Sequence, residues 1–248
     1  RKLADPDITR PLRSELQWLA GTVGEARDNE VMQARLLDLI GAEPPDVVLG
    51  PVVQQIEEHF EAAAHSARAK GLAGLKTPFR PHGRVTAGNA SPLTDGATVS
   101  LLASAEAARE FGLTTKMRLV SFAFAGVEPE VMGIGPIPST EKALKKSGLS
   151  IGDIGLFELN EAFAVQVLSL LDHFGIDDDD PRVNPWGGAI AIGHPLASSG
   201  VRLMIQLARQ FEQHPEVRYG LTAMCVGLGQ GGSMIWENPH YRGGRKGE

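Results

Sequence analysis

Residues 183–200 read V-N-P-W-G-G-A-I-A-I-G-H-P-L-A-S-S-G and place a histidine between a glycine and a proline. His194 follows small and apolar residues, and a helical pattern runs from it to about Phe211. A zinc site recruits several His, Cys or carboxylate ligands at short spacing, and this stretch offers only one. A turn that opens a helix presents backbone N–H groups to anions. The stretch therefore indicates a chemical role for a strand-to-helix turn and no metal site.

Outward from this turn, residues 79–248 alternate short apolar runs with helical patterns, which is typical of an α/β layer with buried strands. We expect a cap at Ser139, a helix end at Gly148, and an antiparallel turn in the glycine-rich join before residue 233. The acidic residues 177–180 are expected in a solvated loop. Strands are predicted at 97–102, 117–124, 154–158, 219–225 and 233–237, and helices at 105–111, 139–148, 161–174 and from His194 to Phe211.

Residues 1–78 have a different texture, with charged helical patterns separated by the breaks Pro44-Pro45 and Gly50-Pro51. One helix is expected at about 28–40. A second is indicated by apolar residues that recur at helical spacing, namely Val52, Ile56, Phe60 and Ala63. His59 and His65 lie in this second pattern as ordinary helix positions, and we assign them no chemistry. The segment is predicted to be a helical accessory region.

Composition excludes several classes of function. The 248 residues are 42% apolar, carry a net charge of −6 and include one cysteine, Cys225. No run is long enough to span a membrane and no signal peptide is apparent, so we expect a cytoplasmic protein. No basic stripe offers nucleic acid a footprint. G-L-G-Q-G-G at 227–232 has the glycine spacing of a dinucleotide site, but it joins two predicted strands and does not open a helix, which argues against an NAD-dependent enzyme.

Polar residues occur where three predicted strands or turns end. Asn160 follows one strand, His194 precedes a helix, and Cys225 ends another strand before glycines. Taken singly they could be a helix cap, a structural turn histidine and a packed thiol. Together they suit chemistry beside a thioester carbonyl, because a thiol near a histidine can exchange a proton with carbon. His194 and a water held by Asn160 could then stabilise the enolate.

The same residues lie in motifs that resemble the carboxy-terminal half of the thiolases, the acetyl-CoA acetyltransferases and 3-ketoacyl-CoA thiolases. The resemblance covers about residues 71–238 and implies an α/β fold, a layered α/β/α half with a mixed sheet. Residues 1–78 are then a helical accessory segment or a loop-domain remnant, and 79–248 a thiolase carboxy-terminal-like domain. The matching motifs are N-E-A-F at 160–163, G-G-A-I-A-I-G-H-P at 187–195, C-V-G at 225–227 and T-A-G-N-A-S-P-L-T-D-G-A at 86–97.

The resemblance implies catalytic roles for three residues. Cys225 becomes the acid/base that protonates the acetyl-CoA enolate in thiolysis or removes the α-proton in condensation. His194 lies in one oxyanion hole and helps to activate a nucleophilic cysteine, and Asn160 holds the water of that hole.

It also implies substrate-binding roles for four residues. The N–H of Gly227 contributes to a second oxyanion hole, Ser91 lines the pantetheine tunnel and Phe163 shapes the pocket floor. Gly188, with Gly193, allows the backbone to approach the thioester closely. Coenzyme A and acyl-CoA are the substrates, and no further cofactor or metal is implied.

One feature departs from the family pattern, since thiolases use a first cysteine to accept the acyl group and Cys225 is the only cysteine here. The chain could be a piece of a longer polypeptide, complete its site with another chain, or lack acyl transfer. The leading hypothesis is the carboxy-terminal part of a 3-ketoacyl-CoA thiolase of fatty-acid β-oxidation, in a homo-oligomer or with a complementary chain. The alternative is a non-catalytic thiolase-like subunit that binds acyl-CoA or acts as a scaffold.

Overall fold

The computed structural model describes residues 33–34, 36–37, 53–59 and 74–243. The chain divides into two compact units, Arg1–Lys76 and Thr77–Glu248. All described residues of the first unit before residue 74 are helical, inside the ranges where two helices are expected. Val52, Phe60, Ala63 and His65 lie outside the described residues. The role of residues 1–78 as an accessory segment stays a prediction.

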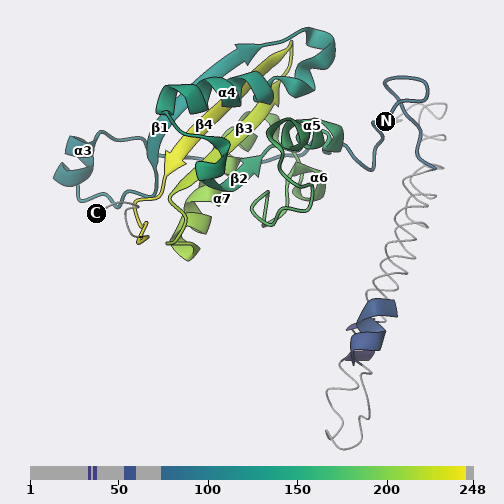
Figure 1. Ribbon diagram of the computed structural model, residues 1–248, viewed down its shortest axis with the longest axis horizontal. Helices are drawn as coiled ribbons and strands as arrows, with labels where there is room; N and C mark the ends of the chain where they lie inside the picture. Colours follow the sequence, from purple (N-terminus) through teal and green to yellow (C-terminus); the bar gives the residue numbers. More distant parts are fainter. Residues whose placement is uncertain (1–32, 35, 38–52, 60–73, 244–248) are drawn as a thin grey trace, which may run out of the picture. The chain divides into compact units, whose positions relative to one another are not determined.

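The second unit is built on a four-stranded mixed sheet with the order β1-β4-β3-β2 (Figure 1). Its strands are β1 Arg118–Gly126, β2 Ile154–Leu159, β3 Tyr219–Val226 and β4 Gln230–Glu237. β2 and β3 are parallel, whereas β4 is antiparallel to both β1 and β3. The predicted strands 117–124, 154–158, 219–225 and 233–237 and the glycine-rich hairpin turn are therefore confirmed.

Helices cover both faces of this sheet. On one face, α4 and α5 pack against inward residues such as Phe157 and Leu159, while on the other α7 packs Leu207 and Phe211 against Leu156. Because successive strand residues point to opposite faces, β2 contributes to both layers. The α/β/α layering expected for the fold is thus present. The helices are α3 Ala105–Glu110, α4 Pro136–Ser147, α5 Ala164–Phe174, α6 Ala189–Ile192 and α7 Leu196–Gln213, with 3-10 turns η1 Pro129–Ile134 and η2 Ile151–Asp153.

The predicted strand at 97–102 is wrong. These residues have no regular secondary structure, and Val99, Leu101 and Leu102 are 89%, 79% and 76% exposed. A strand requires a neighbouring backbone, and no described strand pairs with this segment. Its attachment to the domain includes the hydroxyl of Thr98, which donates to the carbonyl of Ser198 at 3.0 Å. The segment has the apolar side chains of a buried strand, but none of the described residues covers Val99, Leu101 and Leu102.

The start of α4 also differs from the prediction. The helix begins at Pro136, a residue suited to the first helical position, so Ser139 is interior and does not cap it. Ser139 is fully buried, and its hydroxyl lies 2.7 Å from that of Ser233 on β4. The predicted end at Gly148 is confirmed, with φ of 70°, and Lys145 and Lys146 occupy the last turn.

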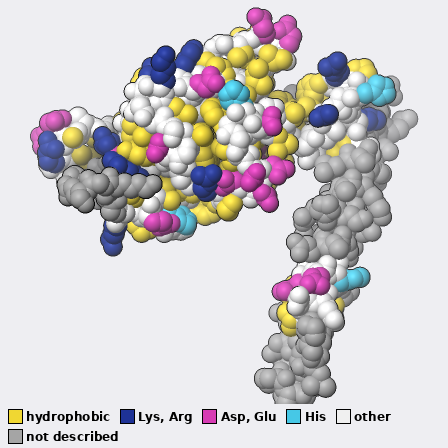
Figure 2. All heavy atoms as spheres, viewed as in Figure 1, with side chains coloured by type: hydrophobic (Ala, Val, Ile, Leu, Met, Phe, Trp, Pro, Cys, Tyr) yellow, Lys and Arg dark blue, Asp and Glu magenta, His cyan; other side chains and the backbone are white. Residues whose placement is uncertain are grey.

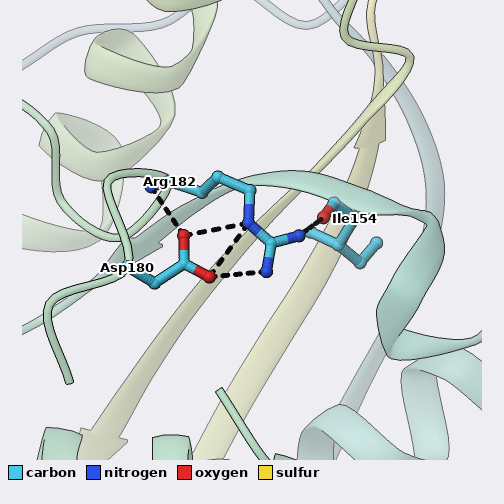
Figure 3. Close-up of polar contacts among 3 residues, drawn as sticks. All are labelled: Ile154, Asp180 and Arg182. Atoms are coloured by element: carbon cyan, nitrogen blue, oxygen red, sulfur yellow. Dashed lines mark hydrogen bonds and ion pairs between the residues drawn. The ribbon is translucent and has the colours of Figure 1, made fainter. Parts of the chain in front are cut away.

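The acidic loop after α5 is solvated at residues 177–179, as predicted, whereas Asp180 is half-buried and forms an ion pair with Arg182 (Figure 3). The guanidinium donates to both carboxylate oxygens at 2.6–3.1 Å and to the carbonyl of Ile154 at 3.2 Å. The hydrogen bonds from Arg182 hold the pKa of Asp180 below its usual value. The next residue, Val183, forms a parallel bridge with Phe157. The loop that leads to His194 is thereby fastened along β2.

Gly135, where η1 meets α4, packs against Gly231 of β4. Gly231 in turn pairs with Cys225 of β3. Because a Cβ on Gly231 would lie 2.0 Å from the carbonyl carbon of Gly135, we expect Gly231→Ala to lower the free energy of unfolding by about 1–3 kcal/mol. Gly227→Ala, at the turn of the same hairpin, is the control, since its Cβ would meet nothing within 4 Å. Urea unfolding of both variants checks this; equal losses would contradict the argument.

Candidate active site

The site begins where β2 ends. Asn160 follows Leu159 directly, is fully buried, and donates its backbone N–H to the carbonyl of Ala223 on β3 at 2.9 Å. Helix α5 starts only at Ala164, with Phe163 in the capping position, so Asn160 is not its cap. The Asn160 side chain is therefore free to face the neighbouring turn.

That turn brings His194 to Asn160. The Nδ2 of Asn160 lies 3.3 Å from Nε2 of His194, and His194 is only 8% exposed. The Oδ1 of Asn160 is buried and has no hydrogen-bond partner among the described residues. A buried amide oxygen without a partner is costly and suits a water or a ligand donor. Two of the three predicted catalytic residues thus meet, from turns 34 positions apart in the sequence.

Residues 89–94 cross both motifs and tie them together. The backbone N–H of Ser91 donates to the carbonyl of Ala162 at 3.0 Å, and that of His194 donates to the carbonyl of Pro92 at 3.0 Å. Gly193 has φ of 98°, and a Cβ there would lie 2.6 Å from the Thr94 side chain. This conformation and close approach restrict the position to glycine. Ser91 is thereby placed at the crossing of the predicted motifs.

Glu161 is a supporting residue for which the sequence indicated no role. Its carboxylate accepts from Nδ2 of Asn184 at 2.8 Å and from the backbone N–H of Ile190 at 3.1 Å, near the start of α6. A Cβ on Gly188 would lie 2.0 Å from the Glu161 carboxyl carbon. Gly188 therefore has a structural reason to be glycine, beside its predicted part in substrate binding. The only sequence signal for Glu161 was its place after Asn160.

Cys225 lies at the same edge of the sheet. Leu159 pairs with Ala223 in the parallel β2–β3 ladder. Asn160 is the residue after Leu159 and Cys225 is the second residue after Ala223, so both lie at this end of the two strands. It is 6% exposed, and burial raises the pKa of its thiol. The resting group is therefore a protonated thiol, suited to giving a proton to carbon. Gly227 follows in the exposed hairpin turn, and the half-buried Phe163 packs edge-on against Phe79 at 5.9 Å.

Buried or half-buried ionisable groups lie on β2 and α7, the elements next to Asn160 and His194. Glu158 on β2 is 1% exposed and accepts a hydrogen bond from Gln210 of α7 at 2.7 Å. Burial raises its pKa to about 7, an effect that the Gln210 hydrogen bond and the charge of Arg202 oppose. Burial, and then the charge of Arg202, lower the pKa of His194, so this ring is neutral at physiological pH.

The described residues contain no cluster suited to a metal ion and no helix suited to crossing a membrane. No group of three or more His, Cys, Asp or Glu side chains in this part of the chain could hold a metal ion. None of its helices combines the length and the apolar character needed to cross a membrane.

Comparison with known proteins identifies the family that the sequence motifs resemble. Residues 113–238 match the family model described as thiolase, C-terminal domain. The 3-oxoadipyl-CoA/3-oxo-5,6-dehydrosuberyl-CoA thiolase of Escherichia coli K12 is 48% identical over 186 residues, which cover 75% of this chain and 46% of that protein. The 3-ketoacyl-CoA thiolase of Photobacterium profundum is 46% identical over 75% of this chain and 48% of its own length.

Solved structures agree. The acetyl-CoA acetyltransferase of Bacillus anthracis aligns with a TM-score of 0.64 and 41% identity, and human mitochondrial 3-ketoacyl-CoA thiolase in complex with CoA with 0.64 and 40%; each alignment covers 68% of this chain and 42% of the other. This chain belongs to the thiolase family and corresponds to its carboxy-terminal part. It spans about half the length of the curated relatives above.

Residues 1–81 match a different model, the CHAD domain. The sequence patterns predicted a helical accessory segment or a loop-domain remnant here and did not indicate this similarity. The two matched regions, 1–81 and 113–238, do not overlap.

The buried carboxyl of Glu158 makes stability depend on pH. Its folded pKa, about 7, exceeds the ordinary 4.5, so its contribution is full below pH 4.5 and is lost as pH rises through 7. We expect the unfolding free energy of the wild type to fall relative to that of Glu158→Gln between pH 4.5 and 7.5, by about 3 kcal/mol. Denaturant titrations at several pH values measure this difference. A difference that does not change with pH would contradict the assignment.

Proposed function

We propose that this chain supplies the carboxy-terminal half of a thiolase active site, which cleaves a 3-ketoacyl-CoA with CoA to a shortened acyl-CoA and acetyl-CoA, reversibly. The observation that carries the proposal is the contact of Asn160 with His194 at the sheet edge where Cys225 also lies. Membership of the thiolase family and the relatives named above support the reaction class. Coenzyme A and acyl-CoA are the proposed ligands, with no further cofactor.

In this proposal Cys225 moves a proton to or from carbon. In thiolysis the bond between the α- and β-carbons breaks, its electron pair forms the acetyl-CoA enolate, and the Cys225 thiol gives its proton to that carbon. In condensation the Cys225 thiolate takes the α-proton back. The thioester oxygen gains charge in the enolate, and donors from His194 and from a water on Asn160 offset it. The unpartnered Oδ1 of Asn160 suits such a water.

The acyl group requires a nucleophile, and Cys225 is the only cysteine among the 248 residues. We place the acyl-accepting cysteine in the part of a thiolase that this chain does not cover. The same observation favours a second candidate function, a non-catalytic thiolase-like subunit that binds acyl-CoA or acts as a scaffold. The two candidate functions differ in one respect: only a thiolase half-site would turn over substrate once the chain is combined with the part that carries the acyl-accepting cysteine.

Exposed apolar side chains support association with that missing part. On the face drawn in Figure 2, hydrophobic side chains reach the surface between charged ones. Large apolar residues are uncovered at Leu93, on the segment predicted as a strand and on α5; those of the last two are Val99, Leu101, Leu102, Val165 and Leu168. Apolar surface of this kind marks an interaction site. We propose that the uncovered part of the thiolase occupies it, on the same or a separate polypeptide, in a cytoplasmic oligomer of fatty-acid β-oxidation.

Cys225→Ala tests the proton-transfer role. In the complete enzyme we expect it to lower the thiolysis rate by about 10²–10⁴-fold without unfolding the domain, because the group that protonates carbon is lost. Val226→Ala, at the next residue of β3, is the control and should leave the rate near that of the wild type. Steady-state thiolysis and circular dichroism give the two readouts. A near-normal rate for Cys225→Ala would sink the assignment.

The association can be tested by complementation. A polypeptide comprising the part of the Bacillus anthracis acetyl-CoA acetyltransferase that this chain does not cover is mixed with the full chain, and complex formation and thiolysis are measured. We expect the double variant Leu101→Asp, Leu102→Asp to lose both, and Val53→Asp in the first unit to keep them. Turnover would exclude the non-catalytic alternative. Binding of the double variant equal to that of the wild type would overturn the proposed surface.

A further inference from the structure

The ring nitrogen of His194 that faces away from Asn160 has its own partner. Its Nδ1 lies 2.6 Å from the hydroxyl oxygen of Ser199, in the first turns of α7. Ser199 is fully buried, and its hydroxyl is also 3.1 Å from the carbonyl of Pro195. His194 is therefore held between two side chains, Asn160 at Nε2 and Ser199 at Nδ1.

The donors and acceptors around His194 favour one placement of its ring proton. The Pro195 carbonyl can only accept, so a hydroxyl that bonds to it donates its single proton to that oxygen. With the hydroxyl proton on the Pro195 carbonyl, the oxygen of Ser199 accepts and Nδ1–H of His194 is the donor. Nε2 consequently carries a lone pair, which matches the Nδ2–H of Asn160 that points to it at 3.3 Å. Each of the three contacts then has one donor and one acceptor. The opposite direction, with Ser199 donating to a bare Nδ1, is the alternative that the experiment below distinguishes.

We propose that Ser199 is a positioning residue that holds neutral His194 in the Nδ1–H tautomer and so keeps Nε2 unprotonated, as the ring atom that can take a proton. The proposal deepens the thiolase function above and rests on it. Serine back-bonding to a carbonyl four residues earlier is common in helices. What distinguishes Ser199 is the second contact of the same oxygen with an imidazole.

The arrangement has a consequence for the reaction. When a thiol of coenzyme A or of the acyl-accepting cysteine is activated, its S–H bond breaks, the electron pair stays on sulfur and the proton goes to Nε2. The resulting imidazolium keeps Nδ1–H on Ser199. Its new Nε2–H becomes a donor for an oxygen that gains negative charge. One ring can thus act first as a base and then as a hydrogen-bond donor without rotating.

The surrounding charges make the Ser199 contact more important. Arg202 lies three residues further along α7, Glu158 is buried on β2, Glu161 follows Asn160, and the Cys225 thiol is at the same edge. Burial and Arg202 disfavour a positive ring at His194. A hydrogen bond to the charged ring offsets this cost, since bonds to ionised groups are the stronger ones.

Nitrogen-15 NMR of the full chain, labelled at histidine and assigned with His194→Gln, tests the proposal. In the wild type we expect Nδ1 of His194 to be the protonated nitrogen and Nε2 the bare one. Ser199→Ala should shift the neutral ring toward the Nε2–H form and lower its pKa by about one unit. Ser198→Ala is the matched control, because the Ser198 hydroxyl bonds to the same Pro195 carbonyl at 3.2 Å but does not bond to His194. It should leave both readouts unchanged.

A protonated Nε2 in neutral wild-type His194 would overturn the proposal, as would a Ser199→Ala variant with unchanged tautomer and pKa. If Ser199→Ala does not fold, the wild-type tautomer and Ser199→Thr, which keeps the hydroxyl, still decide the question. Turnover plays no part in these measurements. A chain without thiolase activity therefore leaves the test intact, and an active enzyme with the wrong tautomer rejects the role of Ser199 alone.

Discussion

The parallel pairing of β2 with β3 is the constraint on which the site depends. Parallel strands end at the same edge of a sheet, so the register of Leu159 with Ala223 brings Asn160 and Cys225 to one edge although 65 positions separate them in the sequence. The backbone bond from Asn160 to Ala223 locks that level. The antiparallel hairpin of β3 and β4 then holds Cys225 from the other side, opposite Gly231.

A second layer of contacts aims the His194 turn at this edge. Arg182 fastens the start of the loop to β2, and Glu161 fastens its middle by accepting from Asn184 and from the α6 backbone. Residues 89–94 bond to both turns, so their own motif and the motifs of Asn160 and His194 are joined. The glycines allow these approaches because a Cβ at Gly188 or Gly193 would collide with Glu161 or Thr94. The position of His194 thus depends on packing by residues to which no chemical role is assigned.

Much of this fold could be predicted from periodicity and punctuation. Strands β1 to β4 and helices α3, α4, α5 and α7 lie where apolar patterns and glycine breaks indicated them. The failures have one cause, since local pattern does not show which surface a segment will meet. Residues 97–102 have a strand pattern without a strand neighbour, Ser139 has a capping residue type inside a helix, and Asp180 belongs to an acidic run but binds Arg182.

The sequence by itself determined the family, because long ordered motifs around Asn160, His194 and Cys225 carry the chemistry in their residue types. It also showed that one cysteine alone is present. Only the tertiary structure decided which groups touch: that Asn160 meets His194, that Ser199 holds the other ring nitrogen, that Glu161 supports the loop and that Glu158 is buried. These contacts join residues far apart along the chain or on different elements, and their distances are set by sheet register and helix packing, which no single segment encodes.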